Sequence, residues 1–207
     1  MEKPTTCLLS PADAAVVIID HQPQMYFGVE SGPRDAVMNG VLGLAKTAQV
    51  FGVPCILTTV VADTFSGPII SKLQSVYPDT VPLDRTAINA WQDARLKAAV
   101  QKTMRKKILL AGLWTEACVT FPALAMKNDG YDVYVVTDAC AGATKAAHYA
   151  AIQRMIQAGV VPVTWQQVLL EFQRDWANDA TYPAVMSVIK EHGSAYGLGV
   201  EYTEAML

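Results

Sequence analysis

Five short runs of apolar, mostly β-branched residues recur along this chain of 207 residues, and longer segments with helical periodicity separate them. The apolar residues in each run are continuous rather than alternating with polar ones, which is typical of strands buried on both faces. The runs lie at residues 14–19, 54–60, 108–113, 133–137 and 160–164. Strands that alternate with helices in this way favour a mostly parallel sheet covered by helices on both faces. We therefore predict the α/β fold class, with a doubly wound sheet.

The segments between the runs have the spacing of amphipathic helices. The predicted helices lie at residues 34–51, 93–105, 117–129, 144–158 and 166–176. Gly52, Gly130 and Gly159 each follow a predicted helix and precede a predicted strand, as glycines at helix C-termini do. Residues 86–91 are less regular, and fit either a short edge strand or an active-site loop.

Only 17% of the residues are charged, against roughly a quarter in an average soluble domain. The longest uncharged runs, 47–62 and 155–170, are shorter than the roughly 18–20 apolar residues that span a bilayer. No signal peptide is visible, and a net charge of −3 argues against a nucleic-acid partner. We expect one domain, residues 1–207, with its core at about 10–175 and a C-terminal extension, 178–207, of unknown role.

The short motifs that would indicate a metal or a nucleotide cofactor are absent. The four cysteines, at positions 7, 55, 118 and 140, include no CxxC pair, so neither a zinc site nor a thioredoxin-type motif is predicted. The chain also lacks GxGxxG, GxSxG and the phosphate-binding GxxxxGK[ST] loop. We therefore expect no cofactor. Cysteines without such pairing fit a reducing compartment, so we expect a cytoplasmic protein.

Polar residues directly follow two of the predicted strands. Asp20, His21 and Gln22 follow the first, and residues 114–118 follow the strand at 108–113. In a doubly wound sheet, ligands bind beyond the carboxyl ends of the strands, where the strand order reverses. If the order is 3-2-1-4-5-6, these two strand ends are neighbours at that point.

Cys118 is predicted to lie near the first turn of a helix. Unpaired N–H groups there lower a thiol pKa and can also stabilise an oxyanion. The alternative is a small residue that packs the corner between strand and helix. Pro122 leaves the Cys118 carbonyl without its regular helical partner and disfavours helical geometry at Phe121, so we expect an irregular backbone at Cys118.

Asp20, at the end of an apolar strand, is a candidate general base for the thiol proton, or alternatively a turn-forming residue. His21 is a rival base, but adjacent residues at a strand end point to opposite faces, so only one of the two can face the substrate. Arg85, in a segment with few charges, would stabilise a carboxylate and a thiolate, or else is a solvated loop residue. His148 and His192 are interpreted as ordinary helix or surface residues.

Five short segments look like those of YcaC-type hydrolases: DHQ at 20–22, residues 58–68, INAW at 88–91, FPAL at 121–124 and VVTDA at 135–139. Three segments in this order resemble the wider family of isochorismatase-like cysteine hydrolases. They are VVIIDHQ at 16–22, RTAINAW at 85–91 and GLWTEACV at 112–119. The resemblance covers about residues 10–175. It implies a three-layer α/β/α domain with the site between strands one and four.

The resemblance also implies residue roles. Asp20 would be the general base and Cys118 the nucleophile. Arg85 stands where many members carry lysine. Arginine keeps the positive charge, but its planar guanidinium does not donate a proton. The family further implies a cis peptide bond, here Leu113–Trp114, and an oxyanion hole formed by the backbone N–H groups of Trp114 and Cys118.

From the matching segments and the residues beside them we take Gln22, Asn89, Trp91 and Phe121 as candidate substrate-binding residues, although the aromatic ones are equally suited to a core. Nicotinamidase-like members hold a metal through an aspartate and histidines after strand two. Here that region contains Asp63 but no histidine. We therefore expect no metal site, which argues against nicotinamide hydrolysis.

Our leading hypothesis is a metal-independent cysteine hydrolase that acts on a small amide-like or related carbonyl compound through a Cys118 acyl-enzyme. One alternative is hydrolysis without a covalent step, as isochorismatase performs on a vinyl ether. The other is a non-catalytic binding or scaffold protein. Low charge is also typical of interface cores, and together with the resemblance it predicts a homo-oligomer, which by resemblance is an octamer.

Overall fold

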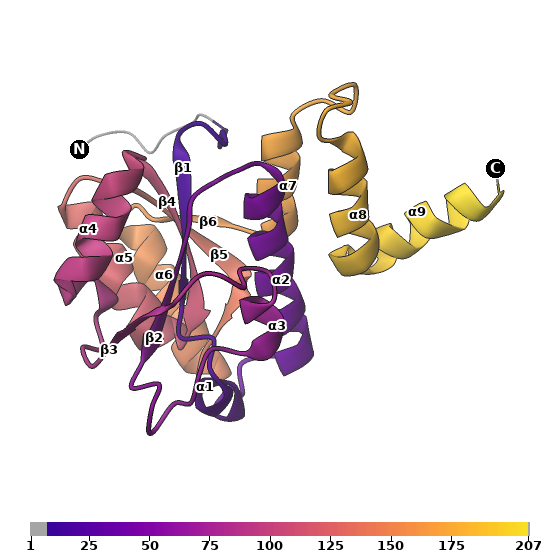
Figure 1. Ribbon diagram of the computed structural model, residues 1–207. Helices are drawn as coiled ribbons and strands as arrows, with labels where there is room; N and C mark the ends of the chain where they lie inside the picture. The colour runs from indigo at the N-terminus through magenta and orange to yellow at the C-terminus, as the bar shows by residue number, and fades with distance from the viewer. Residues whose placement is uncertain (1–7, 207) are drawn as a thin grey trace.

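The computed structural model describes residues 8–206, and its centre is a six-stranded sheet in which every neighbouring pair is parallel (Figure 1). The strands are β1 (Ala14–Ile19), β2 (Cys55–Val60), β3 (Leu83–Arg85), β4 (Lys107–Leu113), β5 (Asp132–Ala141) and β6 (Val161–Val163). Their order in the sheet is β3-β2-β1-β4-β5-β6. The order reverses between β1 and β4, so the predicted strand order is confirmed.

Helices cover both faces of the sheet and form two separate cores (Figure 1). The helices are α1 (Pro23–Phe27), α2 (Arg34–Val50), α3 (Ser71–Gln74), α4 (Ala94–Thr103), α5 (Thr120–Asn128), α6 (Lys145–Gln157), α7 (Trp165–Gln173), α8 (Tyr182–His192) and α9 (Ser194–Met206). Apolar side chains of α2, α3, α7 and α8 pack on one face of the sheet, and those of α4, α5 and α6 pack on the other. The fold is therefore the three-layer α/β/α arrangement.

Most predicted elements lie where the sequence placed them, and the exceptions have physical causes. The edge strand β3 ends at Arg85, so residues 86–89 form a loop rather than a strand, and the 3₁₀ turn Ala90–Gln92 follows this loop. Of the helix predicted at 117–129, the first residues lie in a π-helical turn, Thr115–Val119, and α5 begins at Thr120. Pro122 favours this division because it cannot donate a hydrogen bond within the first helical turns.

The C-terminal extension folds into α8 and α9. Val185, Val188 and Ile189 on α8 are buried in the same core as α2 and α7. In contrast, α9 points away from the body of the molecule (Figure 1). No helix within the described residues is long and apolar enough to cross a membrane.

Candidate active site

Three of the predicted residues meet at the carboxyl edge of the sheet. Asp20 directly follows β1, Arg85 is the last residue of β3, and Cys118 lies in the π-helical turn after β4. All three side chains are nearly or fully buried. Because β1 lies beside β4 and only one strand from β3, the topology brings residues from distant parts of the sequence into contact.

Asp20 and Arg85 form a bidentate ion pair. The Arg85 Nη1 donates to Asp20 Oδ1 over 2.6 Å, and Nη2 donates to Oδ2 over 2.8 Å. The guanidinium also donates to the Thr59 carbonyl over 2.8 Å, which fixes it against β2. Burial raises the pKa of the Asp20 carboxyl above its ordinary value, and the positive charge of Arg85 offsets only part of that rise. The bidentate ion pair favours the charged form of this carboxyl, and a carboxylate with a raised pKa is a stronger proton acceptor.

The thiol of Cys118 donates a hydrogen bond to Asp20, and the backbone N–H of Trp114 contacts the Cys118 sulfur. Burial, together with the negative charge of Asp20, raises the pKa of Cys118 to about 12. The prediction of a lowered thiol pKa is therefore wrong, because the residue lies in a buried π-helical turn beside a carboxylate. The resting pair is a thiol and a carboxylate, with a ready path for proton transfer between them.

The turn that carries Cys118 is held by polar contacts that the sequence did not indicate. The Thr115 hydroxyl lies 2.8 Å from Nδ1 of His148 on α6. Glu116 Oε1 accepts a hydrogen bond of 2.8 Å from the Ala143 backbone. Thr120 donates from its hydroxyl to the Thr115 carbonyl over 2.6 Å. The bonds of Thr115 to His148 and of Glu116 to Ala143 join residues far apart in the chain, so no local pattern reveals them.

The backbone before this turn has the cis peptide bond Leu113–Trp114 that the family resemblance implied. The Trp114 indole leaves the site and donates to the Met25 carbonyl over 2.8 Å. A Cβ atom placed on Gly28 would lie 2.3 Å from the Trp114 ring, so α1 ends with a glycine where the ring packs. The Trp114 backbone therefore lies beside the site, whereas its side chain packs against α1.

Gln22 and His21 are buried and hydrogen-bonded to neighbouring residues, so neither side chain is open to a substrate. The Gln22 amide bonds to the backbone N–H and carbonyl of Val60 and to the Gly67 carbonyl, and the side chain is fully buried. His21 Nδ1 lies 2.8 Å from the Tyr26 hydroxyl, and burial lowers the His21 pKa to about 3. Gln22 therefore organises the loop after β2, and His21 stays uncharged at neutral pH and is a weak proton acceptor.

The remaining candidate binding residues separate into two groups. Trp91 is buried in the core on the α4–α5 face, and its indole donates to Asp129 over 2.7 Å, so it packs as a core residue. The Asn89 side chain accepts from the Trp91 backbone, but it is partly exposed after β3. Phe121 is 37% exposed, one turn beyond Cys118.

The loop after β2, where nicotinamidase-like proteins hold their metal, contains an exposed Asp63. Within residues 8–206, the histidines, cysteines and carboxylates form no group of three that could hold a metal ion. The free cysteines among these residues are Cys55, Cys118 and Cys140, and Cys7 lies outside them. Burial also raises the pKa of Cys55 and of Cys140 to about 12. Cys118 therefore differs from the other cysteines in its contact with Asp20 and not in its thiol pKa.

Comparison with known proteins shows to which family the chain belongs. The family model described as the isochorismatase domain matches residues 14–167. The chain belongs to the isochorismatase family. Probable hydrolase YcaC of Escherichia coli strain K12 is 40% identical over 172 residues, which cover 83% of both chains.

Solved structures agree with this assignment. YcaC from Pseudomonas aeruginosa, solved with hexane-2,5-diol and covalent acrylamide, has a TM-score of 0.91 at 35% identity and matches 97% of this chain and 98% of its own. The Escherichia coli YcaC structure has a TM-score of 0.93 at 35% identity over the full length of both chains. That protein is described as an octameric hydrolase of unknown specificity.

Proposed function

We propose that this isochorismatase-family protein is a metal-independent cysteine hydrolase that cleaves a small amide-like or related carbonyl substrate. The observation that carries the proposal is the buried chain of contacts from the Cys118 thiol to Asp20 and from Asp20 to Arg85. A nucleophile joined to a base, which a third group orients, is the arrangement that covalent hydrolysis requires.

In the first half of the reaction, the Cys118 sulfur attacks the substrate carbonyl carbon while its proton passes to Asp20. The resulting oxyanion accepts hydrogen bonds from the backbone N–H groups of Trp114 and Cys118. Asp20 then returns the proton to the leaving nitrogen, the C–N bond breaks, and a thioester remains. Because the thiol pKa is about 12, transfer to Asp20 accompanies the attack.

In the second half, water attacks the thioester carbonyl and Asp20 accepts the proton from that water. The C–S bond breaks, the proton passes to the Cys118 sulfur, and the carboxylic acid leaves. Arg85 keeps the same ion pair whenever Asp20 is charged, so it positions the base and balances its charge without exchanging a proton. The negative charge that develops in the reaction is thus met by Arg85 and by backbone N–H groups.

Exposed apolar residues follow three strands at the same edge of the sheet and support a small, partly apolar substrate. Phe65 lies in the loop after β2, Ile88 in the loop after β3, and Phe121 on α5 after β4. With the amide of Asn89, Phe121 retains its proposed role in substrate binding. The sequence had pointed to Phe121 but not to Phe65 or Ile88.

The Pseudomonas relative supports a nucleophile in this family, since its structure contains covalent acrylamide. Acrylamide is an electrophile of the kind that thiolates attack. We use it as the probe: the folded protein is treated with acrylamide and its mass and modified peptides are measured. We expect one adduct, on Cys118, before any on Cys7, Cys55 or Cys140.

The matched control is Cys140→Ser, which removes another buried cysteine and should leave the single adduct in place. Loss of the adduct in Cys118→Ala is expected. First modification of another cysteine in the wild type, with Cys118 inert, would overturn the nucleophile assignment. A panel of primary amides, ureido compounds and esters then identifies the substrate class, and turnover by Cys118→Ala would instead support the non-covalent alternative.

We further propose a homo-oligomer in the cytoplasm. The full-length match to a relative described as octameric supports the assembly. The three free cysteines among the described residues fit the reducing compartment. Light scattering at micromolar concentration tests the assembly, and a monomeric mass would contradict it.

A further inference from the structure

The C-terminal helix α9 has little within its own sequence to keep it helical. Its 13 residues, SAYGLGVEYTEAM, include Gly197 and Gly199 and several residues of modest helix propensity. Isolated helices shorter than about 12–15 residues are marginal in water even when rich in alanine. Because α9 points away from the body (Figure 1), packing against another surface is needed to stabilise its outer turns.

The direction of α9 is fixed by a close contact with α8. Ser194 has a φ of 50°, which turns the chain sharply between the two helices. A Cβ atom on Gly197 would lie 2.3 Å from the Ile189 carbonyl oxygen, so only glycine allows this approach. Lys190 on α8 pairs with Glu204 on α9 over 2.5 Å. These contacts with α8 therefore set the direction in which α9 points away from the body of the protein.

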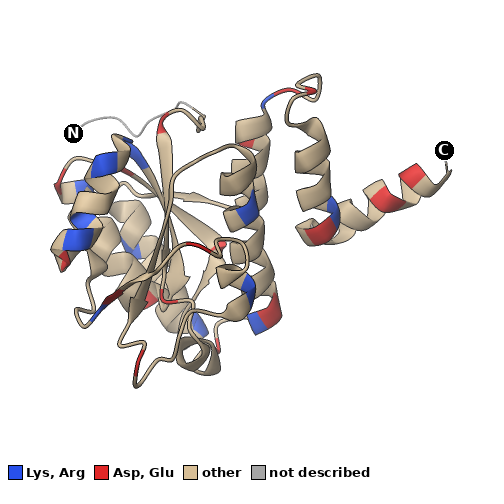
Figure 2. Ribbon diagram, in the orientation of Figure 1, with Lys and Arg blue, Asp and Glu red and all other residues tan. Residues whose placement is uncertain are grey.

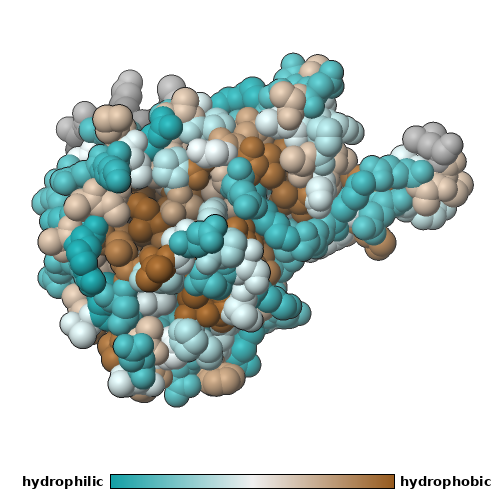
Figure 3. Space-filling model, viewed as in Figure 1, coloured by the Kyte–Doolittle hydropathy of each residue, from teal (hydrophilic) through white to brown (hydrophobic). Residues whose placement is uncertain are grey.

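An apolar stripe runs along the exposed side of α9. Leu198, Tyr202 and Met206 are 67%, 67% and 70% exposed, and their spacing of four residues places them on one side of the helix. In Figure 3 the side of α9 facing the viewer is largely hydrophilic, with a strongly hydrophobic side chain at its lower margin. The stripe has the spacing by which helices bind in apolar grooves.

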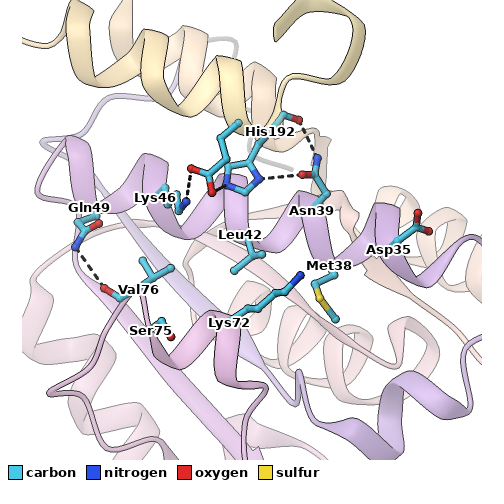
Figure 4. A pocket seen from close by; sticks show the side chains of 11 residues that line it. Asp35, Met38, Asn39, Leu42, Lys46, Gln49, Lys72, Ser75, Val76 and His192 are labelled. Carbon is cyan, nitrogen blue, oxygen red and sulfur yellow. Dashed lines mark hydrogen bonds and ion pairs between the residues drawn. The ribbon is translucent and has the colours of Figure 1, made fainter. Parts of the chain in front are cut away.

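A groove of suitable character lies between α2, α3 and α8 (Figure 4). Its volume is about 670 Å³. Met38, Leu42 and Val76 provide its apolar lining. Charged and polar side chains form its margins, among them Lys46, Lys72, Asp35, Glu191 and His192. The groove is therefore amphipathic, as a surface that receives an amphipathic helix must be.

Hydrogen bonds and an ion pair join the α8 wall of this groove to α2. Asn39 on α2 donates from its amide to the His192 carbonyl over 2.8 Å and accepts from His192 Nδ1 over 2.9 Å (Figure 4). Lys46 pairs with Glu191 over 2.5 Å. Lys72, by contrast, has no ion pair within residues 8–206, and its side chain extends along the groove beside Met38 in Figure 4.

We propose that α9 of each protomer binds in the α2–α3–α8 groove of a second copy of this chain. The apolar stripe then covers the groove lining, and Glu201, which flanks the stripe, pairs with Lys72. The charges of α9 favour this pairing, because the helix carries Glu201 and Glu204 and no basic residue (Figure 2). Glu204 is already paired, so Glu201 is the acid that remains for Lys72.

A second copy is the occupant that the observations favour. The proposal rests on the homo-oligomer proposed above, and a full-length relative is described as octameric. Each copy offers both a helix with an uncovered stripe and a groove, so one symmetric exchange covers two of each. A different protein as partner would leave the same two surfaces on this chain to be covered separately.

The test measures assembly mass by light scattering and sedimentation for wild type and variants, with folding checked by circular dichroism. Leu198→Glu should reduce the assembly to a smaller species. Met104→Glu, at an αL position 90% exposed after α4, is the matched control and should keep the wild-type mass. An unchanged mass for Leu198→Glu would overturn the proposal.

Charge exchange identifies the pairing. Lys72→Glu and Glu201→Lys should each weaken the assembly about 5- to 10-fold in dissociation constant, and the double variant should recover most of that loss. Lys102→Glu, an exposed change on α4, should have no effect. Equal or greater weakening in the double variant would show that the two residues do not face each other.

These outcomes are separate from those of the proposed activity. Acrylamide labelling of Cys118 reports the site in every variant, since none of the changed residues contacts Asp20, Arg85 or Cys118. A normal oligomer in which Cys118 is inert contradicts the hydrolase proposal alone. A labelled but monomeric wild type contradicts the assembly and leaves the hydrolase proposal standing.

Discussion

At the scale of single residues, Cys118 and Asp20 share one proton that decides the reactivity of the site. Burial and the charge of Asp20 raise the pKa of the Cys118 thiol to about 12, so the thiol is protonated throughout the neutral range. With Asp20 as the base, acrylamide labelling of the wild type should change little between about pH 6 and about pH 9, because the bidentate ion pair with Arg85 favours the charged carboxylate over that interval.

Asp20→Asn should change the pH dependence of labelling. The variant lacks the negative charge that raises the thiol pKa, so that pKa falls, and the rate then follows the thiolate fraction. We expect about a tenfold rise per pH unit below the new pKa, and about 100-fold slower labelling at the acid end, where the lost base matters most. A profile as flat as that of the wild type would show that Asp20 is not the base.

Arg85 neutralises a carboxylate that no solvent reaches. Arg85→Met leaves Asp20 buried and unpaired, and should lower the free energy of unfolding by about 3–5 kcal/mol. Arg85→Lys keeps a positive charge and should lose less, although it cannot reproduce both bonds to the carboxylate. Urea unfolding at one fixed protein concentration measures each loss.

The double variant Asp20→Asn with Arg85→Met separates the ion pair from the packing. It should be more stable than Arg85→Met alone, because the buried charge has gone. Additive losses from the two single changes would mean that the pair contributes nothing specific to the site.

At the scale of elements, α2 depends on two glycines for its position on the sheet. A Cβ atom on Gly40 would lie 2.2 Å from the Asp138 carbonyl oxygen of β5, and one on Gly43 would lie 2.6 Å from the Trp165 ring. Gly40→Ala should therefore destabilise the protein by about 1–3 kcal/mol in urea unfolding, although alanine favours a helix by about 1 kcal/mol.

Gly32→Ala is the matched control, because nothing lies within 4 Å of a Cβ atom at that position. It should change stability by less than about 1 kcal/mol. An unchanged or higher stability for Gly40→Ala would show that α2 can move away from β5 at little cost.

The elements that the sequence predicted correctly are those with a strong local pattern. The run at 14–19 coincides with β1 because all six residues are buried. The edge strand β3 contains Asp84 and Arg85 and has no apolar run, so period and composition do not reveal it. The helix α8 was also missed, although Val185, Val188 and Ile189 have helical spacing; its burial depends on α2, far away in the sequence.

The same contrast applies to the site. Asp20 and Cys118 could be predicted because strand ends and a family resemblance both point to them, and Arg85 because it is charged in a segment with few charges and matches the same resemblance. The raised pKa of Cys118 could not, since it depends on how deeply the π-helical turn is buried. Trp91 was misleading because an aromatic residue beside a site motif packs equally well in a core, and here it bonds to Asp129.

At the scale of the whole molecule, two cores account for much of the apolar excess. A sheet covered on both faces needs continuous apolar strands, and all residues of β1 and β4 are buried. The stripe on α9 is apolar surface that neither core uses. A molecule of this composition is therefore expected to complete its burial by association.

Association of this kind makes thermal stability depend on protein concentration. If α9 exchanges between two copies, unfolding and dissociation are coupled, so mass action raises the Tm as concentration rises. For a chain of this length, a tenfold increase should raise the Tm by roughly 2 °C, and scanning calorimetry over a hundredfold range resolves this shift. Leu198→Glu should have a lower Tm with a weaker dependence on concentration, whereas Met104→Glu should follow the wild type. A wild-type Tm that is constant over that range would show that the assembly does not contribute to the stability of the fold.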